Sequence, residues 1–127
     1  MEFVTIARLE EVPTTEARLF QIDGARVLLT RGRDAVYALQ PTCPRRGCDW
    51  SGAAVEGDII RCPRCWCRYS VRTGLNPLTA ACHVNQSTAE AHYRHFPEGH
   101  AQLYDVRVSG GLVEVSRSPR PFRKVLA

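Results

Sequence analysis

Cysteines gather in two short turns of this 127-residue chain, and their spacing suits a metal-binding site. The first turn reads Cys43-Pro-Arg-Arg-Gly-Cys48 and the second reads Cys62-Pro-Arg-Cys65-Trp-Cys67, so five of the 6 cysteines fall in one window. A tight turn that carries two cysteines directs two thiolates toward one point, and two such turns complete a tetrahedral set of sulfur ligands. The sequence therefore predicts a metal site formed by Cys43, Cys48, Cys62 and Cys65.

Composition and charge are those of a globular protein and do not favour nucleic-acid binding. Hydrophobic residues make up 44% of the chain and charged residues 24%, and the length fits a single domain over residues 1–127. The formal net charge is +4, and four basic residues in the C-terminal tail, residues 117–127, account for all of this excess. Because no basic face with interleaved aromatic residues is evident, we predict a solvated tail and no nucleic-acid partner. A docking arm for an acidic partner is the open alternative for this tail.

The sequence shows neither a secretory signal nor a membrane-spanning stretch. Residues 1–8 lack a basic region followed by a long apolar run, and no segment approaches the length of a bilayer span. A cytoplasmic location is therefore expected. In that compartment, clustered cysteines serve as metal ligands or redox groups rather than as structural disulfides.

Short runs of β-branched and aromatic residues, separated by turn signals, predict an all-β barrel or sandwich. Asp23-Gly24 predicts a tight hairpin between strands at 18–22 and 25–30. Residues 55–58 are expected to form a turn within the metal-binding subdomain, which spans about residues 41–74. The remaining strands are expected at residues 2–9, 35–39, 59–61, 68–72, 103–108 and 112–116.

All 4 histidines and the sixth cysteine lie in residues 75–100, a His-rich insertion in which one short helix over 87–95 would fit. A loop of this length is usually functional or disordered. His92 and His95 would share a helix face, because they are three residues apart. A second metal site could then form with Cys82, His83 or His100. Alternatively, these histidines satisfy local hydrogen bonds or are exposed.

Several short motifs together resemble those of Rieske-type ferredoxin domains over Phe3 to Ser116. The matching motifs are Ala7-Arg-Leu, Asp23-Gly, Asp34-Ala-Val-Tyr-Ala-Leu, Cys43-Pro-x-x-Gly47, Gly57-Asp58, Cys62-Pro, Thr73-Gly74 and Tyr104-Asp-Val-Arg-Val-x-Gly-Gly-x-Val-Glu-Val115. The resemblance implies an all-β, Rieske-like antiparallel sandwich or barrel. It also implies a rubredoxin-like, or zinc-ribbon-like, metal-binding subdomain.

The resemblance also implies a ligand set that this chain changes. Rieske domains hold a [2Fe–2S] cluster with two cysteines on one iron and two histidines on the other. The cysteine positions correspond to Cys43 and Cys62, whereas Arg45 and Cys65 occupy the histidine positions. A guanidinium group stays protonated and cannot bind a metal ion, so a standard Cys2His2 centre is not expected.

Three kinds of chemistry remain open for these sulfur atoms. The first is an all-cysteine [2Fe–2S] cluster with Cys43 and Cys62 on one iron and Cys65 with Cys48 on the other; Cys67 and Cys82 are the alternates to Cys48. The second is a single Zn²⁺ or iron ion held by four cysteines in a structural site. The third is thiol redox chemistry at cysteines whose neighbours are arginines.

Electron transfer is the first of two functional interpretations. The chain would then be a small ferredoxin or a redox subunit, with a redox protein or a larger oxidoreductase complex as its partner. The alternative is a zinc-stabilised module with an interaction or assembly role and no redox activity. Catalysis by the chain alone is not expected, because no Ser-His-Asp set, phosphate loop or paired carboxylates are evident.

Overall fold

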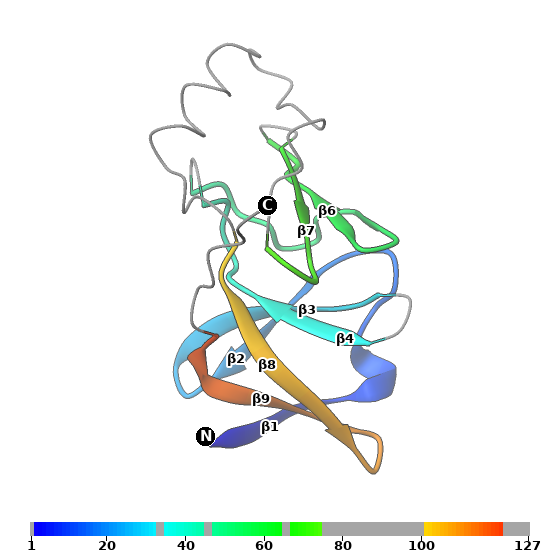
Figure 1. The fold of residues 1–127 in the computed structure, drawn as a ribbon, viewed down its shortest axis with the longest axis vertical. Coiled ribbons are helices and arrows are strands. Elements are labelled where there is room, and N and C mark those ends of the chain that lie inside the picture. The colour runs from blue at the N-terminus through cyan, green and yellow to red at the C-terminus, as the bar shows by residue number, and fades with distance from the viewer. Residues whose placement is uncertain (1, 33–34, 45–46, 65–66, 75–100, 121–127) are drawn as a thin grey trace.

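Two antiparallel sheets form the part of the chain that the computed structural model describes, namely residues 2–32, 35–44, 47–64, 67–74 and 101–120 (Figure 1). The larger sheet is 6-stranded, in the order β1-β9-β8-β4-β3-β2. The edge strands β1 and β2 contact each other, so this sheet nearly closes into a barrel. Its strands are β1 (Phe3–Arg8), β2 (Arg18–Ile22), β3 (Ala25–Arg31), β4 (Val36–Leu39), β8 (Leu103–Ser109) and β9 (Leu112–Pro119).

The smaller sheet is 3-stranded and packs against one side of the barrel (Figure 1). Its strands are β5 (Val55–Glu56), β6 (Ile59–Arg61) and β7 (Arg68–Ser70), and a 3-10 helix, η1 (Leu9–Glu11), follows β1. The all-β prediction is confirmed, whereas the helix expected over 87–95 lies outside the described residues. Within the part of the chain that is described, no helix is long and apolar enough to cross a membrane.

The tight turns agree with their sequence signals. Asp23 and Gly24 have φ angles of 48° and 81°, and they join β2 to β3 with Ile22 paired to Ala25. Both central residues of a type I′ turn need positive φ, which aspartate tolerates and glycine favours. The predicted hairpin is therefore confirmed.

Several predicted boundaries were wrong because strand pairing depends on distant partners. The strand expected over 68–72 ends at Ser70. Val55 and Glu56 form β5 by pairing with Ile60 and Ile59, so the turn expected over 55–58 is shorter than predicted. At the C-terminal end, β9 continues to Pro119 instead of ending at residue 116. The tail predicted from residue 117 therefore begins later.

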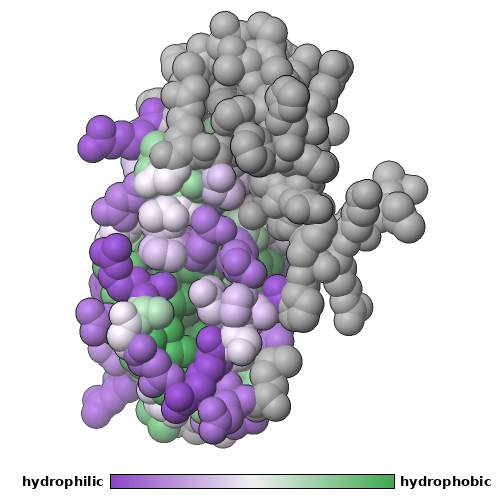
Figure 2. Space-filling model, turned by 90° about the vertical axis from the view of Figure 1, so that its left-hand side faces the viewer, coloured by the Kyte–Doolittle hydropathy of each residue, from purple (hydrophilic) through white to green (hydrophobic). Residues whose placement is uncertain are grey.

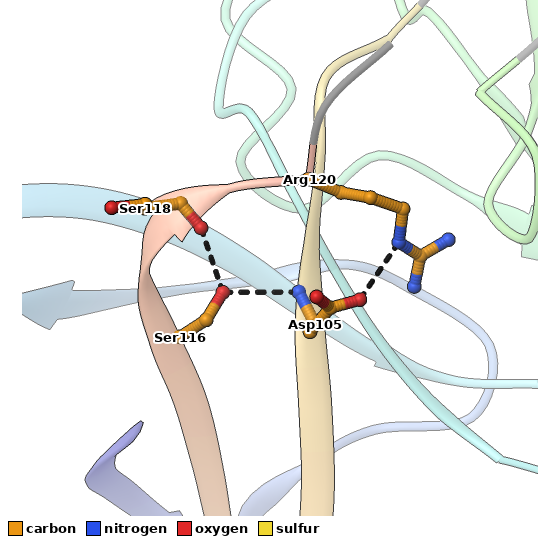
Figure 3. A network of polar contacts seen from close by, with 4 residues as sticks. All are labelled: Asp105, Ser116, Ser118 and Arg120. Atoms are coloured by element: carbon orange, nitrogen blue, oxygen red, sulfur yellow. Dashed lines mark hydrogen bonds and ion pairs between the residues drawn. The ribbon is translucent and has the colours of Figure 1, made fainter. Parts of the chain in front are cut away.

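Polar contacts hold the end of β9 against β8 (Figure 3). The backbone N–H of Asp105 donates to Ser116 Oγ at 3.2 Å, and the Ser116 hydroxyl donates to the Ser118 carbonyl at 2.7 Å. Arg120 Nε donates to Asp105 Oδ1 at 2.8 Å. Arg117 contacts Asp23 Oδ2 at 2.7 Å. Arg117 and Arg120 are exposed, as predicted, and both also form surface ion pairs.

The hydrophobic core has two parts, which lie on opposite faces of β3 and β4. Successive side chains on a strand point to opposite faces. Leu28 and Leu39 accordingly face the small sheet, whereas Leu29 and Ala38 face the barrel interior. These two strands are thus buried on both faces, and they provide the rigid base on which the small sheet packs.

Residues 75–100 leave and rejoin the fold at adjacent points. The N–H of Ala101 donates to the Gly74 carbonyl at 2.7 Å, and the N–H of Gly74 donates to the Ser70 carbonyl at 2.7 Å. Gly74 has a φ of +79°, and a Cβ added to it would lie 2.3 Å from the Ala101 carbonyl oxygen. Position 74 therefore requires glycine, because of its positive φ and because the Ala101 backbone lies so close to it.

Candidate metal centre

The two cysteine turns lie in loops with the same backbone closure. We call residues 43–48 the first cysteine loop and residues 62–67 the second; the first follows β4 and the second joins β6 to β7. The Cys43 N–H donates to the Cys48 carbonyl at 2.8 Å, and the Cys62 N–H donates to the Cys67 carbonyl at 2.8 Å. Each loop therefore begins and ends with a cysteine whose backbone is fixed.

The same equivalence is visible in the sequence. Both loops follow the pattern Cys-Pro-Arg-x-x-Cys, so Cys48 and Cys67 occupy corresponding positions. Cys67, the predicted alternate to Cys48, therefore also flanks the site.

The structure brings the described cysteines of the two loops into one buried hydrophobic cluster. Cys43 is 2% exposed, Cys62 is 0% exposed and Cys67 is 1% exposed, and the partly buried Cys48 packs against the same cluster. Cys43, Cys48 and Cys62 are thiols. Cys67 is disulfide-bonded, so its sulfur must be reduced before it can bind a metal ion.

The other predicted site residues lie outside the described residues. These are Cys65 and Arg45 at the histidine positions, and Cys82, His83, His92, His95 and His100 of the insertion. Among the residues that are described, no three His, Cys, Asp or Glu side chains form a group that could hold one metal ion. Cys65 as a ligand and the second metal site in the insertion both stay predictions.

Two aromatic side chains occupy the cluster that contains the cysteines. Trp50 follows the first cysteine loop and is 0% exposed, and Tyr69 on β7 is also fully buried. Their ring centroids are 5.2 Å apart with an interplanar angle of 52°. The Trp50 backbone is fixed on both sides, since its N–H donates to the Pro41 carbonyl and its carbonyl accepts the Ala53 N–H. These rings exclude water from the base of the loops.

Basic side chains gather around the second cysteine loop. Arg61 and Arg68 directly flank it and are paired across β6 and β7, and the exposed Arg64 lies within it. Residues 41–74 contain six arginines and three acidic residues, so this subdomain is cationic although residues 1–116 as a whole are neutral. Counting charge by subdomain, rather than over the whole body, would have found this asymmetry.

Exposed apolar side chains lie at the opposite end of the molecule. In the described part of the chain, the large hydrophobic residues that are exposed are Val108 and Leu112, beside the β8–β9 turn and far from the small sheet (Figure 1). Hydrophilic residues cover most of the described surface on the face that Figure 2 shows, with a smaller hydrophobic area between them. Among the described residues, the end with the cysteine loops therefore presents charged side chains and no exposed large hydrophobic ones.

Residues 2–97 match the family model described as the Rieske [2Fe-2S] domain, and the chain therefore belongs to that family. No curated protein matches the sequence. Among solved structures, the ferredoxin of carbazole 1,9a-dioxygenase from Nocardioides aromaticivorans IC177 is 22% identical with a TM-score of 0.70, and the match covers 93% of this chain and 100% of that chain. The Sphingomonas yanoikuyae B1 ferredoxin is 15% identical with a TM-score of 0.67, covering 92% of this chain and 100% of that chain.

A third similar structure comes from a larger protein. The terminal oxygenase of carbazole 1,9a-dioxygenase from Novosphingobium sp. KA1 is 20% identical with a TM-score of 0.73, and the match covers 94% of this chain but 31% of that chain. At these identities the likeness concerns the fold. The predicted Rieske fold and family are thus confirmed, and the exchange of the histidine ligands stays a prediction.

Proposed function

We propose that this chain holds a [2Fe–2S] cluster and transfers one electron at a time, as a small ferredoxin or as a redox subunit of a larger oxidoreductase complex. The observation that carries the proposal is the pair Cys43 and Cys62, both buried at the start of equivalent closed loops. Full-length likeness to two ferredoxins supports a carrier rather than an enzyme acting alone. A reducing compartment such as the cytoplasm would keep these thiols available.

The residues present fit an iron–sulfur group. Thiolates are the ligands that such clusters take, and a buried site limits contact of the cluster with solvent. Cys43 and Cys62 would hold the inner iron, while the backbone closure of each loop fixes the sulfur positions and Trp50 and Tyr69 exclude water. When bound, the cluster supplies a one-electron redox couple.

The outer iron would be held by Cys65 and Cys48. Arg45 cannot replace a histidine ligand, and Cys48 is a thiol at the end of the same loop. Thiolates in place of neutral imidazoles add negative charge, which stabilises the oxidised cluster. We therefore expect a reduction potential near that of plant-type ferredoxins, about −400 mV, instead of the Rieske range of about −150 to +300 mV.

The partner proposed for this chain is a redox protein with an acidic docking surface. The arginines that flank the second cysteine loop favour approach of a negatively charged surface to the end where the cluster would lie. A solved complex of reduced oxygenase and oxidised ferredoxin in carbazole 1,9a-dioxygenase contains a chain with the same fold (TM-score 0.71). Electron transfer to an oxygenase is accordingly one form that the proposed function could take.

Anaerobic reconstitution tests the proposal. The reduced, unfolded chain is refolded with ferrous iron and sulfide, and we expect two irons and two sulfides per chain, absorption between about 400 and 600 nm, and an EPR signal on reduction. A parallel sample refolded with zinc and iron together measures which metal the site prefers. A colourless product with one zinc per chain would contradict electron transfer and favour a structural zinc module.

A Cys48→Ser variant tests the proposed outer ligand. We expect it to lose most of its iron, or to hold a cluster with an altered EPR signal, because a hydroxyl is a poor replacement for a thiolate on iron. Cys67→Ser is the matched control, since Cys67 occupies the corresponding position of the second loop. If Cys67→Ser loses iron and Cys48→Ser does not, the outer ligand is Cys67 and not Cys48.

A further inference from the structure

The second cysteine loop ends in a cysteine whose oxidation state differs from that of the other described cysteines. Cys43, Cys48 and Cys62 are thiols, whereas Cys67 is disulfide-bonded. Cys48 and Cys67 occupy corresponding positions, and the backbone carbonyl of each accepts a hydrogen bond of 2.8 Å from the first cysteine of its loop. The two loops therefore share one backbone closure but differ in the chemistry of their last sulfur atom.

The disulfide of Cys67 lies in the cluster where the metal centre would be bound. Cys67 is 1% exposed and belongs to the same buried cluster as Cys43 and Cys62. The predicted outer ligand, Cys65, is two residues away in the same loop. The Cα atoms of residues two apart are at most about 7 Å from each other, and disulfides need a Cα separation of about 4.4–6.8 Å. A bond between Cys65 and Cys67 would therefore stay within the second cysteine loop.

We propose that this disulfide joins Cys67 to Cys65 and acts as a redox gate on the metal centre; the inference rests on the ligand role of Cys65 in the function proposed above. Metal ions bind cysteine as the thiolate, and a disulfide sulfur has no such charge to offer. While the bond exists, the second cysteine loop can supply only Cys62. Metal binding through Cys65 and this disulfide are thus mutually exclusive.

Opening the gate requires two electrons and two protons, which a dithiol reductant supplies. One thiolate of the reductant attacks a sulfur atom of the bond and displaces the other as a thiolate. The second thiol of the reductant then releases the remaining cysteine, and the reductant becomes a disulfide. Because Cys67 is 1% exposed, we expect the attack at the Cys65 sulfur. The thiol–disulfide balance around the protein would in this way set the fraction of chains that can bind the cofactor.

Zinc binding tests the gate without depending on cluster assembly. Metal-free protein prepared without reductant is compared with protein that has been reduced by dithiothreitol and freed of it under argon, and both are titrated with Zn²⁺ against a chromophoric chelator. We expect the reduced protein to bind zinc at least about tenfold more tightly, because even groups that only support metal ligands change the affinity by about 10–100-fold. A thiol assay on the denatured chains should find two more thiols per chain after reduction.

Two serine variants show whether the bond at Cys67 causes the difference. Cys67→Ser cannot form the bond, so it should bind zinc equally well with and without reduction. Cys82→Ser is the matched control, because it keeps both members of the proposed bond and should show the wild-type difference. A Cys82→Ser protein that needs no reduction would show that the bond uses Cys82, and the inference would be wrong. Equal zinc affinity of the reduced and unreduced wild-type proteins would also overturn it.

Failure of the gate and failure of the proposed function give different results. If iron and sulfide assemble a cluster on the unreduced wild-type protein as readily as on the reduced one, electron transfer stands and the gate does not. If the reduced protein binds only zinc and the unreduced protein binds none, the gate stands and electron transfer does not. A reduced protein that binds neither zinc nor a cluster overturns both.

Discussion

Replacement of Cys62 by serine is expected to abolish cluster binding while leaving the two sheets in place. Cys62 is fully buried, and its backbone N–H closes the second cysteine loop, so serine can keep this backbone closure while the sulfur is removed. Serine has nearly the same size but is a poor ligand for iron in sulfur-rich sites. Bound iron should fall to a small fraction of the wild-type value. The stabilisation that the cluster gives should disappear too, and would be about 2.7 kcal/mol for a group present at 100 times its dissociation constant.

Iron and sulfide analysis, with visible and far-UV circular dichroism, measures this result. Ala53→Ser is the matched control, because Ala53 is buried in the same cluster and the substitution adds a hydroxyl without removing a thiolate. The control should keep its iron. A Cys62→Ser protein with wild-type iron content would show that the inner cysteines do not hold the cofactor.

Gly74→Ala should be among the most destabilising single substitutions in the described part of the chain. Its φ of +79° costs a residue with a Cβ about 1–2 kcal/mol. The added Cβ would also lie 2.3 Å from the Ala101 carbonyl oxygen, a backbone atom that cannot move without breaking the hydrogen bond between the two residues. We therefore expect the free energy of unfolding to fall by about 3 kcal/mol or more, measured by urea denaturation.

Gly52→Ala separates the two contributions to that loss. Gly52 has the same φ of +79°, but nothing lies within 4 Å of a Cβ added there. Its replacement should cost only the backbone term, about 1–2 kcal/mol. Equal losses for the two variants would mean that the approach of Ala101 contributes nothing to the requirement for glycine at position 74.

Features that depend on neighbouring residues could be read from the sequence. Asp23-Gly24 specifies its hairpin because both residues accept positive φ. The cysteine loops can be predicted from their residue types and spacing. By contrast, β5 is a strand only because Ile59 and Ile60 pair with it. Its two residues carry no recognisable signal by themselves.

The site shows the same division between local and distant causes. Cys43 and Cys62 follow from the local motif, whereas the contact of Trp50 with Tyr69 follows from packing between distant parts of the chain. The ion pair of Arg117 with Asp23 likewise joins β9 to a turn that lies far away in the sequence. No pattern around Trp50 or Arg117 predicts these partners, since the partners are set by the topology.

The hydrogen bond between Gly74 and Ala101 has a consequence for how this protein can vary. Because the chain departs and returns at one place, the segment between these residues can change in length without shifting any strand. The entropic penalty for closing such a segment rises by only about 0.6 kcal/mol with each doubling of its length. We therefore expect the length of this segment to differ among relatives without changes in the barrel or the cysteine loops.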